Sequence, residues 1–157
     1  MKQTALNNKH ILVTGGTGSW GHELIRQLLK RYPDVAEIRV LSRGEHKQVD
    51  MLGEYGADKR LCFIIGDVRN KDIVKYATRG VNVVFHLAAL KHVPVCEDNS
   101  WEAVLTNIIG TQNVIESAVE NNVETVIDVS TDKAVEPYNL YGMTKACGEK
   151  LMVNANA

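Results

Sequence analysis

The side chains with the clearest chemical potential lie near the C-terminal end of the sequence. Tyr141 and Lys145 are four residues apart, so a helix that begins near Tyr141 would place phenol and ammonium on one face, one turn apart. A phenol with a pKa near ~10 is a poor base at neutral pH, and a nearby cation lowers that pKa. The pair predicts a tunable acid or base, although such pairs also occur simply as neighbours on a solvated helix.

A polar run precedes this pair and adds a hydroxyl, a carboxylate and a second ammonium: Thr131, Asp132 and Lys133. The run follows the apolar residues 126–129, which predict a buried strand. Ligands of open α/β sheets bind at the carboxyl ends of the strands. A carboxylate and a lysine side by side can be driven toward acid and base roles. The alternative is an exposed ion pair of little energetic value.

A glycine-rich turn lies between a predicted strand, residues 10–14, and a predicted helix, residues 23–31. Its spaced glycines suit a tight turn, close approach of a pyrophosphate, and close packing of helix on strand. The first N–H groups of the helix would bind the anion. Glycines also merely punctuate turns, but strand, turn and helix occur here in the required order. The cofactor-binding residues expected here are Thr14, Gly15, Thr17, Gly18, Ser19, Trp20 and Gly21.

The end of the second predicted strand bears on the choice of dinucleotide. Ser42 and Arg43 end that strand, and Lys47 follows one turn later. An NAD site usually carries a carboxylate here for the ribose 2′-hydroxyl. The arginine instead favours NADP, because a guanidinium binds phosphate through paired, charge-assisted hydrogen bonds. NAD stays the alternative, since a charged segment can also be a solvated basic patch.

Further cofactor-binding residues are expected after the third and fourth strands: Asp67, Val68, Ala88, Ala89 and Lys91. Asp67 could accept a hydrogen bond from the adenine amine, or simply cap the helix that follows. The small alanines would let the backbone approach the cofactor. His92 and Glu97 are expected in the same loop as Lys91, facing the same cleft, with His92 either a substrate contact or a surface histidine.

Strand-like and helix-like segments alternate along the chain. The predicted strands are residues 10–14, 37–42, 61–65, 81–87 and 125–129, and the predicted helices are 23–31, a charged segment to about 54, 72–78, 101–120 after an N-cap at Ser100, and one from about 141. Such βαβ units require a parallel sheet with right-handed crossovers. We predict one doubly wound α/β dinucleotide-binding (Rossmann) domain over residues 1–157, with strand order 3-2-1-4-5.

The bulk properties fit one globular domain of 157 residues, 45% hydrophobic and 24% charged. A net charge of −1 gives no reason to expect a nucleic-acid or membrane partner. No apolar run approaches the ~20 residues of a membrane span, and residues 1–10 lack the apolar core of a secretory signal, so the cytoplasm is expected. The cysteines and histidines lack ligand spacing, and we expect neither a disulfide framework nor a metal site.

Three motifs together resemble the extended branch of the short-chain dehydrogenase/reductase superfamily: residues 14–21, Gly66-Asp67-Val68, and Tyr141-x-x-x-Lys145. Four longer segments look like the UDP-N-acetylglucosamine 4,6-dehydratases that invert carbon 5 and supply pseudaminic acid and capsular polysaccharide: residues 42–48, 88–94, 106–114 and 130–145. The resemblance covers essentially the whole chain. Its most specific part is the Thr131-Asp132-Lys133 run.

The resemblance implies a mechanism. Tyr141 would take the proton of the carbon-4 hydroxyl as hydride passes to NADP, while Lys145 lowers its pKa and holds the nicotinamide ribose. Lys133 would remove the carbon-5 proton, Asp132 would protonate the departing carbon-6 hydroxyl, and Thr131 would hydrogen-bond the reacting oxygen. Hydride would then return to carbon 6, which regenerates the cofactor.

Members of the resembled family are longer and carry a small C-terminal domain that grips the UDP-sugar, which we expect to be absent here. The chain is then a truncated product, a cloned fragment, or a domain that works with a separate partner. Three functions stay open: a dehydratase; a nucleotide-sugar 4-epimerase, which needs no base such as Lys133; and an NADP-binding module without turnover. We expect weak or absent turnover with NADP binding retained.

The resemblance also bears on the long helix and on assembly. It implies a structural role for Asn107, within the helix that begins near Trp101. It further implies a homodimer through that helix and the helix from Tyr141. The apolar positions of the two helices could equally belong to the internal core.

Overall fold

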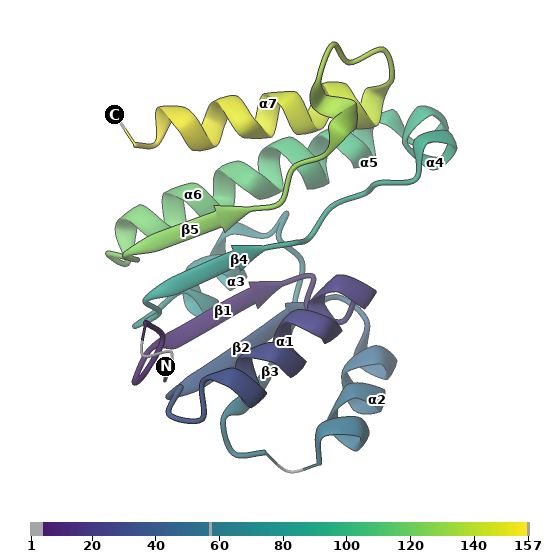
Figure 1. Ribbon diagram of the computed structural model, residues 1–157. Helices are drawn as coiled ribbons and strands as arrows, with labels where there is room; N and C mark the ends of the chain where they lie inside the picture. Colours follow the sequence, from purple (N-terminus) through teal and green to yellow (C-terminus); the bar gives the residue numbers. More distant parts are fainter. Residues whose placement is uncertain (1–4, 57, 157) are drawn as a thin grey trace.

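The computed structural model describes residues 5–56 and 58–156. Its centre is one five-stranded parallel sheet in the order β3-β2-β1-β4-β5 (Figure 1). The strands are β1 (His10–Thr14), β2 (Glu37–Ser42), β3 (Leu61–Ile65), β4 (Val83–His86) and β5 (Thr125–Asp128). The doubly wound fold and the strand order are therefore confirmed. Residues 1–4, which belong to the segment predicted to carry no secretory signal, and Ala157 lie outside the described residues.

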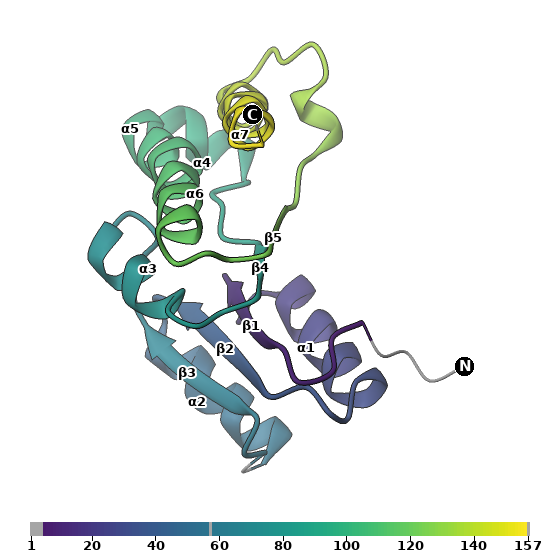
Figure 2. The same ribbon diagram turned by 90° about the vertical axis from the view of Figure 1, so that its left-hand side faces the viewer.

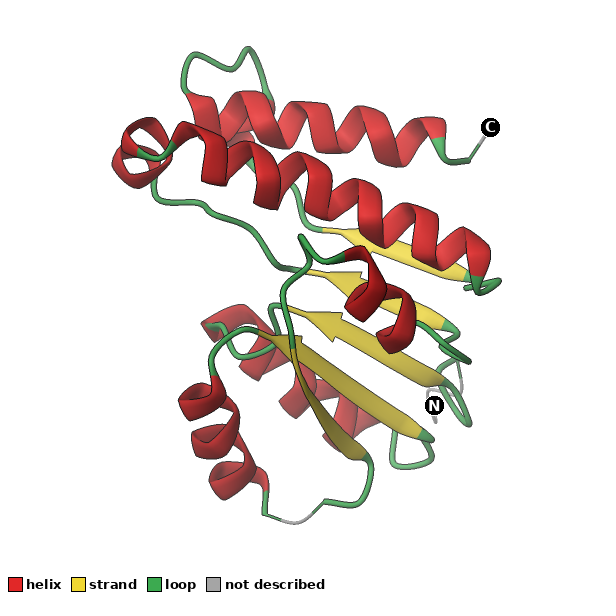
Figure 3. Ribbon diagram, turned by 180° about the vertical axis from the view of Figure 1, so that it is seen from behind, coloured by secondary structure: helices red, strands yellow, loops and turns green. Residues whose placement is uncertain are grey.

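Helices cover both faces of the sheet. They are α1 (Ser19–Arg31), α2 (Glu45–Tyr55), α3 (Lys71–Ala77), α4 (Val93–Asp98), α5 (Ser100–Val104), the π-helical η1 (Leu105–Ile109), α6 (Gly110–Glu120), the 3-10 turn η2 (Asp132–Ala134) and α7 (Leu140–Asn154). Helices α1 and α2 lie on one face and α3 and α6 on the other (Figure 2). Helix α7 runs alongside α6 (Figure 3).

Side chains alternate along each strand between two apolar cores, because successive residues of a strand point to opposite faces. The core beneath α1 and α2 includes Ile11, Val13, Ile25, Ile38, Val40 and Met51. The core beneath α3 and α6 includes Leu12, Leu41, Val74, Val84 and Val114. Both cores hold the strands in parallel register, so their carboxyl ends, and the loops that follow, meet at one edge of the sheet.

The predicted last strand is present as β5, but the prediction that residues 126–129 are buried is wrong. β5 lies at the edge of the sheet, and Ile127 is 41% exposed. Ile127 points to the sheet face that α1 and α2 cover. Val126 and Asp128 point to the opposite face, toward α6 and α7. One face of β5 thus exposes an apolar side chain to solvent. The other face directs the Asp128 carboxylate toward the helices.

The segment after β4, predicted as a loop with Lys91, His92 and Glu97 facing the cleft, contains helix α4. Pro94 is the second residue of α4, where a proline is tolerated because first-turn N–H groups have no helical partner. His92 is the N-cap of α4. Glu97 lies on α4, and its carboxylate accepts a hydrogen bond from the N–H of Leu140 at the start of α7 (2.8 Å). Glu97 therefore helps to dock α4 on α7.

The predicted cap at Ser100 is wrong, and so is the alternative interpretation of Asp67 as a helix cap. Helix α5 begins at Ser100, and Asn99 occupies its cap position. The cap of α3 is Asn70, whose side chain accepts hydrogen bonds from two N–H groups of the first turn (3.0 and 3.3 Å). Asp67 does not cap α3, because its carboxylate is bound by Arg69 instead.

The long helix predicted over residues 101–120 is present but not uniform. It widens into a π turn at η1, between α5 and α6. Such turns are rare and often found at functional sites. Asn107 lies in this turn, and its side chain is completely buried.

Candidate active site

A cleft of about 470 Å³ opens at the carboxyl ends of the first four strands. Its walls contain most of the predicted cofactor-binding residues: Gly15, Thr17, Gly18, Ser42, Arg43, Lys47, Asp67, Val68, Ala88, Ala89 and Lys91. They also contain five residues not predicted from the sequence: Leu41, Gly44, Gly66, Leu87 and Thr106. Residues from four separate loops thus surround one cavity.

The glycine-rich turn between β1 and α1 is tight, and two of its glycines leave no room for a side chain. Gly15 has φ of 68°, and a Cβ there would lie 2.8 Å from the backbone of Ala88. A Cβ at Gly21 would overlap the backbone of Gly16. The turn closes with a hydrogen bond from the Gly18 N–H to the Gly15 carbonyl (3.0 Å). Gly18 is also the cap of α1 and offers no capping side chain, so the helix presents its first N–H groups to an anion.

Six of the predicted residues do not line the cleft: Thr14, Ser19, Trp20, Gly21, Tyr141 and Lys145. Ser19 and Trp20 are exposed at the start of α1. Thr14 lies fully buried below the cleft. Its hydroxyl accepts hydrogen bonds from the N–H groups of Leu87 and Ala88 (3.2 and 3.3 Å), and so fixes the cleft wall after β4.

His86, which sequence reasoning missed as a site residue, completes this arrangement. Its Nδ1 lies 2.7 Å from the Thr14 hydroxyl, and its Nε2 lies 3.2 Å from the Thr111 hydroxyl. The Thr111 hydroxyl donates to the Asn107 carbonyl (2.7 Å), so it accepts from Nε2–H, and Nδ1 is left to accept from Thr14. Burial, together with the charge of Lys145, lowers the pKa of His86 to about 3. The ring is therefore neutral at physiological pH.

Asp67 and the arginines around it form the polar end of the cleft. The Arg43 guanidinium is exposed and lies 3.9 Å from the Asp67 carboxylate. Burial raises the pKa of Asp67, but hydrogen bonds from Arg69 outweigh that effect and lower it overall. Asp67 is thus a charged hydrogen-bond acceptor that faces the cavity.

The Thr131-Asp132-Lys133 run lies outside the cleft, at the carboxyl end of β5. The Thr131 hydroxyl donates to the Asp132 carboxylate (3.0 Å), and the Lys133 ammonium lies 3.5 Å from the same oxygen. The hydrogen bond from Thr131 and the charge of Lys133 lower the pKa of Asp132, whose side chain is 86% exposed. For Asp132 to donate a proton, a substrate would have to exclude water and raise that pKa.

Gly142 brings this run against the start of α7. A Cβ at Gly142 would overlap the carbonyl oxygen of Lys133 and lie 3.1 Å from Pro137 Cβ. The missing side chain therefore lets the turn of Lys133 pack directly against the first turn of α7, which also contains Tyr141. Sequence reasoning did not single out Gly142, although it lies between Tyr141 and Lys145.

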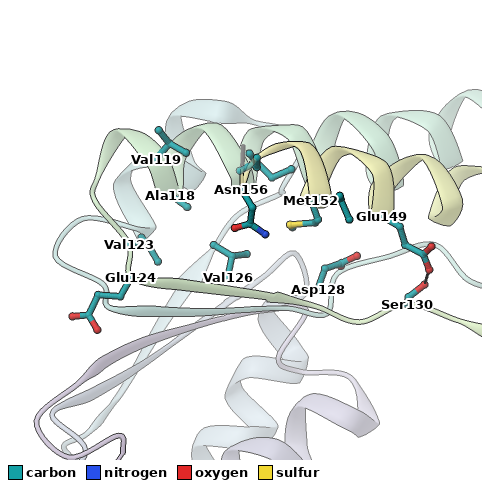
Figure 4. A pocket seen from close by; sticks show the side chains of 13 residues that line it. Ala118, Val119, Val123, Glu124, Val126, Asp128, Ser130, Glu149, Met152 and Asn156 are labelled. Atoms are coloured by element: carbon teal, nitrogen blue, oxygen red, sulfur yellow. Dashed lines mark hydrogen bonds between the residues drawn. The ribbon is translucent and has the colours of Figure 1, made fainter.

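Lys145 forms a buried ion pair with a carboxylate that was not predicted as a site residue. Its ammonium lies 3.1 Å from the Asp128 carboxylate, and both side chains are buried, with 4% and 7% of their surface exposed. Burial raises the pKa of Asp128, an effect that Lys145 partly offsets. Figure 4 shows Asp128 on β5 beneath α7, with Glu149 and Ser130 hydrogen-bonded beside it. The signal in the sequence was a charged residue inside an apolar strand.

Asn107 links the cofactor cleft to α7. Its side chain accepts from the N–H of Leu90 and donates to the carbonyl of Leu90 (both 2.8 Å). The same amide donates to the Thr144 hydroxyl on α7 (3.0 Å). The segment that forms the cleft wall and the helix that carries Tyr141 and Lys145 are thus fixed to one another.

Within residues 5–56 and 58–156, no three His, Cys, Asp or Glu side chains lie close enough to hold a metal ion together. None of the helices formed by these residues is long and apolar enough to cross a membrane.

Residues 11–157 match the model of a known family, described as polysaccharide biosynthesis protein. The chain belongs to this family. A UDP-glucose 4-epimerase of Rickettsia rickettsii is 49% identical over 148 residues, which are 93% of this chain and 43% of that protein. A UDP-N-acetylglucosamine 4,6-dehydratase (inverting) of Campylobacter jejuni is 47% identical over 150 residues, 96% of this chain and 44% of that protein. The predicted relationship to nucleotide-sugar dehydratases of the extended branch is confirmed.

Two further proteins are similar to this chain. A protein of Methanocaldococcus jannaschii, named only as an uncharacterized membrane protein, is 54% identical over 149 residues, 95% of this chain and 44% of that protein. The solved dTDP-glucose 4,6-dehydratase DesIV of Streptomyces venezuelae, with NAD bound, superposes with a TM-score of 0.82 at 33% identity, over 90% of this chain and 50% of that one. The chain spans less than half the length of the curated relatives it matches.

The buried ion pair makes Lys145 important for stability in this member of the polysaccharide biosynthesis family. We expect Lys145→Met to lower the free energy of unfolding by about 3–5 kcal/mol at pH 7, because it leaves the Asp128 carboxylate buried and unpaired. The loss should shrink as the pH falls, since Asp128 can then be neutralised by a proton. Urea unfolding at pH 7 and pH 5 measures both effects.

A surface pair provides the control for this variant. Lys9 pairs with Glu124 at 2.7 Å, but the two side chains are 31% and 50% exposed. Lys9→Met should cost at most about 1 kcal/mol, as exposed ion pairs generally do. Equal losses in the two variants would contradict a special role for the buried pair.

Proposed function

We propose that this chain is the cofactor-binding part of an NADP-dependent nucleotide-sugar 4,6-dehydratase that acts on UDP-N-acetylglucosamine with inversion at carbon 5. The observation that carries the proposal is the packing of the Lys133 turn on Gly142, beside Tyr141. We infer that this packing lets a base, a carboxylate and a phenol act on one sugar where η2 packs against α7. The relative in Campylobacter jejuni that bears this activity in its name supports the same assignment.

Each side chain has a role that its chemistry permits. Tyr141 accepts the proton of the sugar's carbon-4 hydroxyl, and the charged Lys145 one turn later stabilises the phenolate. Lys133 removes the carbon-5 proton once carbon 4 is a ketone, because the ketone acidifies that position. The bound sugar excludes water from Asp132, which then donates a proton to the departing carbon-6 hydroxyl. Thr131 hydrogen-bonds the reacting oxygen.

The residues of the cleft fit a nicotinamide dinucleotide. Gly15, Gly18 and the first turn of α1 offer backbone N–H groups and space for a pyrophosphate. Arg43 and Lys47 line the end of β2, and Asp67 lies across the cavity as an acceptor. A bound nicotinamide supplies the hydride acceptor that oxidation at carbon 4 requires. Two cations and no carboxylate at the end of β2 favour NADP over NAD.

A 4-epimerase is the second candidate, because a relative with 49% identity carries that name. Epimerisation also begins with a proton transfer to Tyr141, but it needs no base at carbon 5. Lys133 and Asp132 would then have no role, which favours the dehydratase. A third possibility is a module that binds NADP without turnover, since the relatives are more than twice as long.

One assay separates the three candidates. The pure chain is incubated with NADP and UDP-N-acetylglucosamine in deuterated water, and the products are read by mass spectrometry and NMR. We expect NADP binding and weak formation of a 4-keto-6-deoxy sugar labelled at carbon 5. A 4-epimer without loss of water would establish the epimerase, and cofactor binding without either product would establish the module. Unchanged carbon-5 exchange in Lys133→Ala would remove Lys133 as the base.

We also propose that the chain forms a homodimer through α7 and the helix that begins at α5. An apolar hollow of about 640 Å³ on this side of the molecule is lined by Ile108, Pro137, Met143, Ala146, Cys147, Lys150 and Leu151. Met143 is 46% exposed, so these positions belong only partly to the internal core. Sedimentation equilibrium tests the proposal, and a monomer at all concentrations would contradict it.

A further inference from the structure

Gln48 occupies an unusual position beneath the NADP-selective end of the cleft. It lies on α2 and is only 5% exposed. Its side-chain NH2 lies 3.2 Å from the Ser42 carbonyl, 2.8 Å from the Ile64 carbonyl and 2.9 Å from the Ser42 hydroxyl. Carbonyl oxygens only accept hydrogen bonds, so the NH2 end of the amide must face them. The orientation of Gln48 is therefore fixed.

This orientation determines what the Ser42 hydroxyl can do. The NH2 group of Gln48 offers no acceptor, so the Ser42 hydroxyl, 2.9 Å away, cannot donate its own proton to it. Over residues 5–56 and 58–156, the hydrogen bonds of Ser42 include no acceptor for that proton. Ser42 is buried on its protein side and lines the cleft on the other. The hydroxyl is thus left to donate into the cleft.

We propose that Gln48 is a positioning residue for cofactor choice, because it makes the Ser42 hydroxyl a donor toward the 2′ substituent of the adenosine ribose. That ribose lies at the end of the second strand in folds of this type. A 2′-phosphate accepts hydrogen bonds and benefits from this donor, whereas a 2′-hydroxyl is best held by an acceptor. The inference rests on the proposed use of NADP and adds a residue that does not itself touch the cofactor.

The test compares the affinities of the chain for NADP and NAD by isothermal titration calorimetry. In Gln48→Met the side chain has similar length but no donor, so the Ser42 hydroxyl becomes free to turn away from the cleft. We expect the ratio of NADP to NAD affinity to fall by about threefold to tenfold. A change of this size corresponds to the loss of about one hydrogen bond. Val49→Met, on the exposed neighbour, should leave the ratio unchanged.

A double-mutant cycle with Ser42→Ala decides whether Gln48 acts through Ser42. We expect Ser42→Ala to lower the ratio by about tenfold. Adding Gln48→Met should then change it no further, since the hydroxyl that Gln48 orients is gone. An equal weakening of both cofactors by Gln48→Met, or an effect that persists in Ser42→Ala, would show a general structural role and overturn the inference.

A substitute variant and the cofactor preference of the unaltered chain complete the test. If Gln48→Met does not unfold cooperatively, Gln48→Glu takes its place, because it keeps the size but accepts a hydrogen bond from Ser42. Its effect on the ratio should be larger than that of Gln48→Met, and at least part of it should disappear in Ser42→Ala. If the unaltered chain binds NAD more tightly than NADP, the proposed cofactor is wrong. The coupling between Gln48 and Ser42 would still be readable from the cycle.

Discussion

Gly142→Ala is expected to lower formation of the 4-keto-6-deoxy product by about 100-fold or more, with NADP affinity unchanged. The new Cβ would overlap the Lys133 carbonyl oxygen and crowd Pro137, so the turn must move off α7. A displacement of about 1 Å between reacting groups is enough for a loss of this size. The cofactor cleft contains no residue of this turn, which is why binding should survive.

Gly148→Ala is the matched control on the same helix. The nearest atom to a Cβ there is the Asn107 carbonyl oxygen at 3.6 Å, an ordinary contact. Alanine is favoured over glycine inside a helix by about 1 kcal/mol, so this variant should be at least as stable as the parent. Product formation and urea unfolding measured on both variants test the contrast. Parental turnover in Gly142→Ala would mean that the Lys133 turn does not act beside Tyr141.

The sheet could be predicted from sequence because its information is local. β1, β2 and β3 have the predicted bounds, since each is a short segment rich in β-branched and other apolar residues. Their order was predicted from the dinucleotide-binding fold that the first strand, the glycine-rich turn and the helix together indicate. α4 was missed for a local reason too, because Pro94 suits a first helical turn as well as a loop.

The residues of the candidate site likewise fall into those that local sequence predicts and those that it does not. Residues proposed to touch a cofactor through backbone or an exposed side chain, such as Gly15 and Arg43, could be chosen from motif and spacing, and most of them line the cleft. The residues that hold these in place could not. His86 meets Thr14, and Gln48 meets Ile64, only when distant strands and helices pack, and no spacing rule encodes such pairs.

Asp128 is a site residue that its position in the sequence does signal. A carboxylate inside an apolar strand must find a partner, because an unpaired buried charge is costly. The partner had to be a cation from another element at the same end of the sheet, and Lys145 was already singled out. Its pairing with Lys145 could therefore have been proposed from the sequence, although its geometry could not.

The neutral state of His86 predicts that the chain loses stability in mild acid. Its pKa in the folded chain is about 3, well below the ordinary value of 6.5. Below pH 6.5 the imidazole of His86 binds a proton in the unfolded chain but not in the folded chain, so unfolding is favoured as the pH falls. The stability present above pH 6.5 should therefore decrease by about 2 kcal/mol between pH 7 and pH 5, from this residue alone.

His86→Asn isolates that contribution, because asparagine keeps an acceptor for the Thr14 hydroxyl but cannot be protonated. The variant should be less stable at pH 7, having lost the bond to Thr111, yet its unfolding free energy should change less between pH 7 and pH 5. His46→Asn, at an exposed position of α2, should keep the slope of the parent. Urea titrations at half-unit pH steps measure all three chains. Equal slopes in His86→Asn and the parent would show that protonation of His86 does not drive the loss, and that the ring is not held neutral between Thr14 and Thr111.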